Sequence, residues 1–274
     1  MELRQLREMA GLPGRELARR IKISQSKVSR IESGLTVPTL PEVSRWCEVV
    51  GASDERRELL MMATEAVFTE VRTWPTGVES PAHVQEEVLG REVRARLIRT
   101  FQHSVVPGLL QTADYARRLL SMLRPDERRS VAAMVAGRMD RQVVLYDEEK
   151  RFEFLITEAA LRWRPGPVRT LLAQLDRISS ITTLENVSVG LILEGQEATV
   201  PNSHGFSVYS GDDGDMDTFV EVETIHANLI IGDSDAVARY LDHWMKLSGM
   251  AIYGDEARKH LVNLAEEFRD SAGR

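Results

Sequence analysis

The stretch 14–34 constrains the fold most strongly, because its apolar residues recur at helical spacing on both sides of a short polar break. Leu17 and Ile21 lie on one stripe before the break, and Val28 and Ile31 lie on another after it. This spacing predicts two short amphipathic helices joined by a turn of about three residues. Both helices must bury their stripes against other helices, because neither is long enough to be stable alone.

The residues around this pair predict where its helices begin and end. Ser24 precedes the second apolar stripe, and its hydroxyl can accept a hydrogen bond from a free backbone N–H as an N-cap. Gly34 follows the stripe and is expected to end that helix. Flanking stripes predict one helix before the pair and two after it, over about 2–10, 38–50 and 54–69. Residues 1–72 are therefore predicted to form an all-helical domain of five helices.

Two helices joined by so short a turn form a helix-turn-helix unit, whose second helix enters the DNA major groove. At about 100° per residue, the inward Val28 and Ile31 leave the opposite face of this helix polar. Glutamine can pair with adenine, arginine with guanine, and serine with either base. The predicted base contacts are Gln25, Ser26, Ser29 and Arg30. Basic residues at the margin of the helix pair lie where phosphates run, which predicts phosphate contacts from Arg19, Lys22 and Lys27.

Charge supports this interpretation when it is counted by region. The whole chain of 274 residues carries a net charge of −7. Residues 1–34 contain eight Lys or Arg and four Glu, so this segment is +4 and the remainder is −11. Such asymmetry is typical of a basic nucleic-acid-binding module joined to an acidic body. The alternative is that the basic helix faces are simply solvated and the bundle contacts protein.

The sequence LRQLREMAGLPGRELARRIKISQSKVSRIESGLTVPTL resembles the lambda-repressor-like, XRE-type helix-turn-helix domain. The shared elements are ELA at 16–18, SQS at 24–26 and RIESG at 30–34. The resemblance implies base contacts from Gln25, Ser26 and Arg30, with Lys27 near bases or phosphate. The family often has glutamine at the position of Gly14, which reaches a phosphate. Here only the backbone N–H of Gly14 can make that contact.

Residues 73–83, with two prolines and a glycine, are predicted to be an interdomain linker, and Trp74 within it to pack against a neighbouring surface. The following 84–270 are predicted to form an α+β domain with a small, mainly antiparallel sheet, so the fold class is α plus α+β. Helices are expected over 84–101, 125–145, 165–180, 234–250 and 255–268. Strands are expected from period-two patterns over 151–156, 186–193, 205–211, 217–224 and about 227–231.

One segment of this second domain, GRMDRQ, places Arg138 and Arg141 one helical turn apart. The simpler interpretation is a solvated basic edge that pairs with Asp140 or Glu148. The sharper interpretation is a contact to an acidic ligand, linker or partner. We expect the simpler one.

The segments VPGLLQTADYARRLL, RMDRQVVL, TEAALRW, LLAQLDRI and VEVETIHANLII resemble the C-terminal domain of unknown function found in WhiJ-type actinobacterial regulators. The resemblance covers about 85–265. It implies a transcriptional regulator that often acts beside a small partner protein, in a toxin–antitoxin-like arrangement. It names an architecture more firmly than a mechanism.

Motifs for catalysis or metal binding are weak in this sequence. SQSK at 24–27 and YDEEK at 146–150 match short enzyme motifs but lack the other parts of those sites. DDGDMD at 212–217 lacks the glycine and glutamate of a calcium loop and is interpreted as a hairpin turn. His204 and His226 are near strands, and Cys47 is expected to be a buried structural thiol. We therefore expect no enzyme activity, no metal and no cofactor, unless one pocket holds two converging, buried titratable groups.

These features predict a sequence-specific DNA-binding transcriptional regulator, whose larger domain serves dimerisation and control by a ligand or partner. The alternative is an antitoxin-like protein that mainly binds a small partner protein, with DNA binding as autoregulation. The expected partners are double-stranded DNA, a second copy in a homodimer and a small protein. No apolar run approaches the roughly 18 residues of a membrane helix, so we expect no membrane contact and a cytoplasmic, nucleoid-associated protein.

Overall fold

The structure is a computed structural model that describes residues 2–34, 36–73, 81–123, 128–211, 218–225 and 227–272, and only the backbone of 65–73, 81–87, 128 and 129. The chain divides into two compact units. The first contains Met1–Arg72 with Leu229–Ala238, and the second contains Thr73–Asn228 with Arg239–Arg274. The middle of the predicted linker, including Trp74, lies outside the described residues. Its ends belong to a strand and a helix, β1 (Thr69–Thr73) and α6 (Pro81–Arg94).

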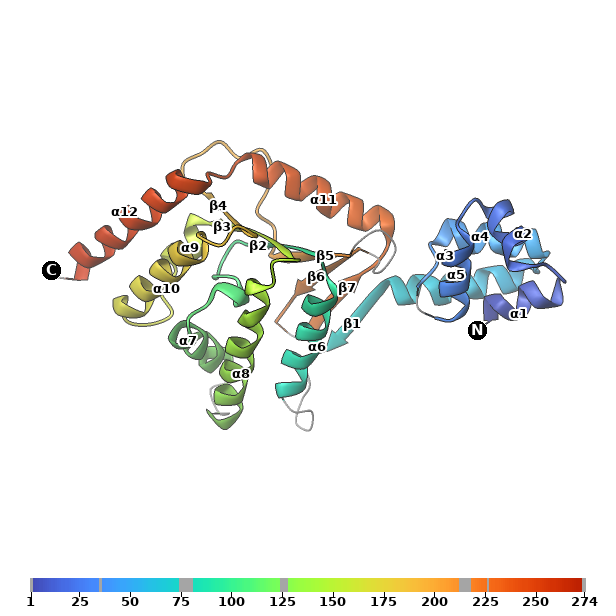
Figure 1. Ribbon diagram of the computed structural model, residues 1–274, viewed down its shortest axis with the longest axis horizontal. Coiled ribbons are helices and arrows are strands. Elements are labelled where there is room, and N and C mark those ends of the chain that lie inside the picture. Colours follow the sequence, from blue (N-terminus) through green and yellow to red (C-terminus); the bar gives the residue numbers. More distant parts are fainter. Residues whose placement is uncertain are drawn as a thin grey trace. The chain divides into compact units, whose positions relative to one another are not determined.

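The first unit contains the five predicted helices, which are labelled in Figure 1. They are α1 (Glu2–Met9), α2 (Gly14–Ile21), α3 (Gln25–Glu32), α4 (Leu40–Val50) and α5 (Asp54–Phe68). The apolar stripes of α2 and α3 meet around the indole of Trp46, which is fully buried. A second cluster joins Val43 and Cys47 of α4 to Leu60 of α5. Burial of these stripes holds the short helices in place.

Local capping chemistry sets the helix ends of this unit. The Ser24 hydroxyl accepts a hydrogen bond from the backbone N–H of Lys27 at 3.1 Å, as its N-cap role predicts. Helix α4 begins with a reciprocal capping box, in which Thr39 and Glu42 each bond the other's backbone N–H. Gly34 and Gly51 follow α3 and α4 with φ of +75° and +68°, a conformation in which a side chain would be strained.

The second unit is built on a mixed sheet, so the expected α+β fold is confirmed, whereas the expected mainly antiparallel pairing is confirmed only in part. Of the strand order β1-β7-β6-β5-β2-β3-β4, the strands β6-β5-β2-β3-β4 lie wholly within this unit. Central β2 pairs in parallel with β3, which pairs in parallel with β4, whereas β2 pairs antiparallel with β5 and β5 antiparallel with β6. Their bounds are β2 (Leu97–Gln102), β3 (Arg151–Thr157), β4 (Val187–Ile192), β5 (Phe206–Ser210), β6 (Phe219–Glu223) and β7 (Ala227–Ile231).

The parallel pairs follow from the helical connections between these strands. The chain passes through α7 (Ala113–Leu123) and α8 (Arg128–Arg141) between β2 and β3, and through α9 (Glu158–Arg162) and α10 (Val168–Ile181) between β3 and β4. Such crossovers return the chain to the same end of the sheet and give parallel pairing. Two short 3-10 helices, η1 (Gly108–Leu110) and η2 (Gln142–Tyr146), flank this region.

The expected helix over 84–101 is also wrong at its C-terminal end, where the chain forms β2. Ile98 and Phe101 are buried in the sheet, and β2 has a strand partner on each side. Its apolar residues fit both a helical and an extended pattern, and the pairing partners decide between them. The predicted hairpin is confirmed as β5 and β6, although its turn at 212–217 lies outside the described residues.

Helices cover both faces of this sheet, as Figure 1 shows. Helices α6, α7 and α8 lie on one side of the central strands, and α11 (Ser234–Gly249) lies on the other. The main core joins the sheet to α9, α10 and α12 (Gly254–Ala272) and includes the predicted strand face of Phe152, Phe154 and Ile156. Coverage of both faces explains why β3 buries nearly every residue after Arg151.

Candidate nucleic-acid interface

The turn between α2 and α3 places the polar side of α3 outward. Lys22 ends α2 in the left-handed conformation, with φ 61° and ψ 44°, and its backbone N–H bonds the carbonyl of Ala18. Helix α3 then begins at Gln25 after the Ser24 cap. Val28 and Ile31 are 2% and 5% exposed, so they fix the inner side of α3. The opposite side of α3 therefore faces solvent.

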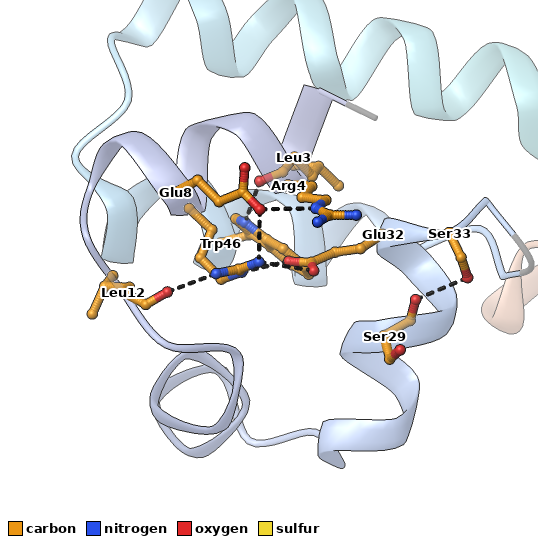
Figure 2. Close-up of polar contacts among 9 residues, drawn as sticks. Leu3, Arg4, Glu8, Leu12, Ser29, Glu32, Ser33 and Trp46 are labelled. Carbon is orange, nitrogen blue, oxygen red and sulfur yellow. Dashed lines mark hydrogen bonds and ion pairs between the residues drawn. The ribbon is translucent and has the colours of Figure 1, made fainter.

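The four predicted base-contacting residues all lie on α3. Gln25, Ser26 and Ser29 are exposed, and Arg30 is partly exposed. The Arg30 Nε atom is buried and has no hydrogen-bond partner in the described part of the chain. The Ser26 hydroxyl lies 3.0 Å from that of Ser24. The Ser29 carbonyl accepts from Ser33 Oγ at 2.9 Å, as Figure 2 shows. The structure thus places these residues together, and their contact with bases stays a prediction.

The predicted phosphate contacts are less uniform. Gly14 is the first residue of α2, and Lys22 is exposed at the turn. Arg19 is exposed but donates to the Glu16 carboxylate, with Nη2 at 2.7 Å from Oε1. Lys27 instead forms an ion pair with Glu42, at 2.9 Å from its Nζ to Oε1. In the free protein Lys27 is therefore a packing contact of α3 against α4, and a phosphate would compete with Glu42 for it.

The pKa of Glu42 depends on two opposing effects, burial and hydrogen bonding. Burial tends to raise the pKa of the Glu42 carboxyl, because a charge loses hydration. Hydrogen bonds from the Thr39 backbone N–H and from Lys27 favour the charged form and outweigh burial, so the pKa lies below its ordinary value. The carboxylate therefore serves as both the cap of α4 and the anchor of α3.

The C-terminal end of α3 is held by a second pair at Glu32, a residue labelled in Figure 2. Arg7 of α1 donates to both oxygens of Glu32, from Nε at 2.5 Å and from Nη2 at 2.9 Å. Its Nη1 also donates to the carbonyl of Leu12 at 2.8 Å, and Trp46 Nε1 donates to the carbonyl of Leu3 at 3.2 Å. A bidentate arginine pair is directional, so it fixes the orientation of α3 as well as its distance from α1.

Two residues near the predicted interface were not expected from the sequence. Arg15 Nε donates to Gln25 Oε1 at 3.2 Å and so lies beside the first predicted base contact. Glu16 accepts from Arg19 and Arg20, and these hydrogen bonds lower its pKa to about 2. The sequence signal for Arg15 is its position on the first turn of α2, one residue from Gly14. Glu16 pre-positions two arginines and also shields them from a phosphate.

The cysteine and the two histidines considered in the sequence lie outside helices α2 and α3. Cys47 is 1% exposed, and burial raises the pKa of its thiol. His204 Nε2 lies 2.9 Å from Tyr240 Oη in an aromatic cluster, and His226 lies outside the described residues. Among the residues that the structure describes, no group of three or more His, Cys, Asp or Glu is placed to hold a metal. None of its described helices is long and apolar enough to cross a membrane.

The expectation of a solvated basic edge at 138–141 is wrong. Arg141 is buried and pairs with Glu92, with its Nη2 2.7 Å from Oε1. Arg138 donates from Nη1 to Gln111 Oε1 at 2.7 Å, and its Nε is buried. Asp140 is exposed to solvent. Folding of α8 against α6 turns the arginines inward, which local spacing cannot reveal.

Comparison with known families identifies both units. A model described as a domain of unknown function, DUF5753, matches residues 85–263. A model described as a helix-turn-helix domain matches residues 1–60, which include α1 to α4. No curated protein sequence matches this chain.

Two solved structures are similar to this chain at low sequence identity. A phospholipase D family member, Nuc from Salmonella typhimurium, is 15% identical with a TM-score of 0.35, covering 68% of this chain and 97% of its own. TrmBL2, an archaeal chromatin protein, is 10% identical with a TM-score of 0.34, covering 89% of this chain and 88% of its own. At these values neither similarity supports a conclusion about function.

Proposed function

Because this chain belongs to the family defined by the domain of unknown function DUF5753, with a helix-turn-helix domain ahead of it, we propose that it is a sequence-specific DNA-binding transcriptional regulator. The observation that carries this proposal is the outward polar side of α3, which follows a tight turn and is held from within by Val28 and Ile31. Recognition helices of this kind present polar side chains to base edges. We also propose that its helix-turn-helix domain is of the XRE type and that its second domain is the one found in WhiJ-type regulators.

In this proposal the base edges are contacted by the side chains of Gln25, Ser26, Ser29 and Arg30. Backbone phosphates are assigned to Gly14, Arg19, Lys22 and Lys27. One such module buries little DNA surface, so useful affinity normally requires two copies on half-sites about one helical turn apart. We therefore propose a homodimer on a palindromic operator, and no catalytic role for the protein.

The test selects a binding site from genomic fragments with the full-length protein and then measures affinity for it. Gln25→Ala combined with Arg30→Ala is expected to weaken specific binding by about 100-fold or more, since each bidentate pair contributes about 1–3 kcal/mol per protomer. Gln5→Ala combined with Arg57→Ala is the matched control, because these side chains lie on α1 and α5. Equal affinity of the Gln25/Arg30 double variant and wild type would disprove the proposal.

A partner-binding role is the second candidate, and one observation favours it. Val143 and Tyr146 of η2 are 71% and 58% exposed, although both are large and apolar in part. The chain outside residues 1–34 is acidic, which suits a basic partner. Purification from the native host distinguishes the candidates. A stoichiometric small basic protein supports an antitoxin-like role, whereas a lone homodimer that binds its operator argues against it.

A further inference from the structure

The second unit contains a cavity of about 140 Å³ beside the centre of its sheet. Its floor is formed by side chains of β2, β5 and β6, and its walls by α6, α7, α8 and η1. Ile98, Leu109 and Phe154 give one part of the lining an apolar character. A cavity of about 150 Å³ accommodates benzene, so this one has room for about six non-hydrogen atoms.

Four buried charges around the cavity are satisfied within the protein. Arg141 pairs with Glu92 through two hydrogen bonds, at 2.7 Å and 3.0 Å. Arg91 pairs with Glu221, which also accepts from Asn228. Buried ion pairs of this kind leave no net charge for a ligand to neutralise. Glu92 and Glu221, two of the three carboxylates that line the cavity, are thus paired with arginine, which also argues against their use as a general acid or base.

Arg138 differs from these paired groups. Its Nη1 donates to the neutral Gln111 side chain at 2.7 Å, and its Nε is buried without a hydrogen-bond partner in the described residues. No described carboxylate forms an ion pair with it. Burial, reinforced by the nearby positive charge of Arg141, lowers the Arg138 pKa to about 10, although Glu223 and Glu92 act in the opposite direction. Arg138 is partly exposed and lines the cavity, so its guanidinium is available to an anion that enters there.

We propose that this cavity binds a small monoanionic carboxylate, with its two oxygens accepting hydrogen bonds from Arg138. A guanidinium presents parallel N–H groups that match a carboxylate. A short apolar group on the ligand would lie against Ile98 and Phe154. A phosphate dianion suits the site less well, because Glu223 also lines the cavity and repels a second negative charge.

Binding itself is independent of the proposed DNA-binding function. Control of DNA binding by such a ligand would rest on that function. The two are tested separately, by measuring ligand binding without DNA and operator affinity without ligand. Loss of one then leaves the other measurable.

The probe is butyrate, which has six non-hydrogen atoms, and butyramide is its neutral isostere. Titration calorimetry with the full-length protein at constant ionic strength is expected to show butyrate binding in the millimolar range and at least tenfold weaker butyramide binding. Arg138→Gln is expected to weaken butyrate binding at least tenfold. Arg117→Gln removes an exposed arginine of α7 that pairs with Asp114, and is expected to change nothing.

Three results would overturn the assignment. They are an absence of butyrate binding in wild type, equal binding by Arg138→Gln, and tighter Arg138-dependent binding of inorganic phosphate than of butyrate. Glu223→Gln is the second variant, since this residue lines the cavity and is also exposed to solvent. Removal of its charge is expected to tighten butyrate binding about threefold, and unchanged or weaker binding contradicts the proposal.

A stability measurement separates a ligand-binding arginine from a structural one. Arg138→Met is expected to melt at the same temperature as wild type or higher, because it replaces a cation whose Nε is buried without a hydrogen-bond partner among the described residues by an apolar side chain. A markedly lower melting temperature would show that Arg138 is a structural residue and would overturn the proposal.

Discussion

Lys22 carries a conformational cost at the turn before α3. Among the residues that the structure describes, it is the non-glycine position with positive φ, at 61°. A side chain in this left-handed region costs about 1–2 kcal/mol relative to the right-handed one. The predicted phosphate contact of Lys22 offers a reason for keeping a lysine where glycine would fit the backbone better.

Lys22→Gly is therefore expected to stabilise the first unit by about 0.5–1 kcal/mol, after allowing for the greater flexibility of glycine in the unfolded chain. Hydrogen exchange of buried amides in α2 and α3 measures this stability. The same variant is expected to bind DNA more weakly, because it lacks the charge. Lys22→Gln serves as the control, with the same loss of DNA binding and no gain in stability.

Glu42 is a second residue whose contribution to the stability of the first unit can be tested. Its pKa is lowered in the folded protein, so its charge stabilises the fold above the ordinary glutamate pKa of about 4.3, and that contribution is lost as the pH falls through the lowered value. Glu42→Gln keeps an oxygen for the Thr39 N–H but loses the ion pair with Lys27.

Glu42→Gln is expected to destabilise the first unit by about 1–2 kcal/mol at pH 7. The difference from wild type should shrink below about pH 4, as measured by denaturation at several pH values. A difference that grows as the pH falls would contradict the assigned direction. At pH 7 the variant also frees Lys27, so its affinity for non-specific DNA is expected to rise.

At the scale of elements, α3 depends on its first turn. Gln25 and Ser26 lie directly after the Ser24 cap, so fraying there displaces predicted base contacts. Ser24→Ala is expected to cost about 1 kcal/mol and to weaken specific DNA binding. Ser53→Ala removes a similar hydrogen bond, to the Arg56 N–H at the start of α5, and is expected to cost stability alone. Equal DNA affinities of the two variants would count against this role for α3.

Elements with local signals were predictable from the sequence, and elements that depend on distant partners were not. Ser24 and Gly34 act on their own helix ends, so the boundaries of α3 followed from the sequence. The strand β2 did not, because its identity depends on β3 and β5, which lie far along the chain. The pairing of Arg141 with Glu92 is likewise non-local, which is why a solvated edge was expected instead.

At the scale of the whole molecule, charge asymmetry predicts how DNA binding responds to salt. Each phosphate contact releases counterions and contributes about −0.9 to the slope of log affinity against log salt. Arg19→Gln is expected to reduce the magnitude of this slope by about 0.9 per protomer, with little change in sequence preference. Arg57→Gln is the control. An unchanged slope in Arg19→Gln would show that its pairing with Glu16 persists in the complex.

The mixed pairing of β2 also sets an order of events during synthesis. Its parallel partner β3 leaves the ribosome well before its antiparallel partner β5, which lies more than a hundred residues beyond β2 in the chain. At about 5–20 residues per second, one edge of β2 stays open for several seconds after β3 is made. An open edge is a site for pairing with another nascent chain. The yield of folded protein should therefore depend on translation speed between β3 and β5.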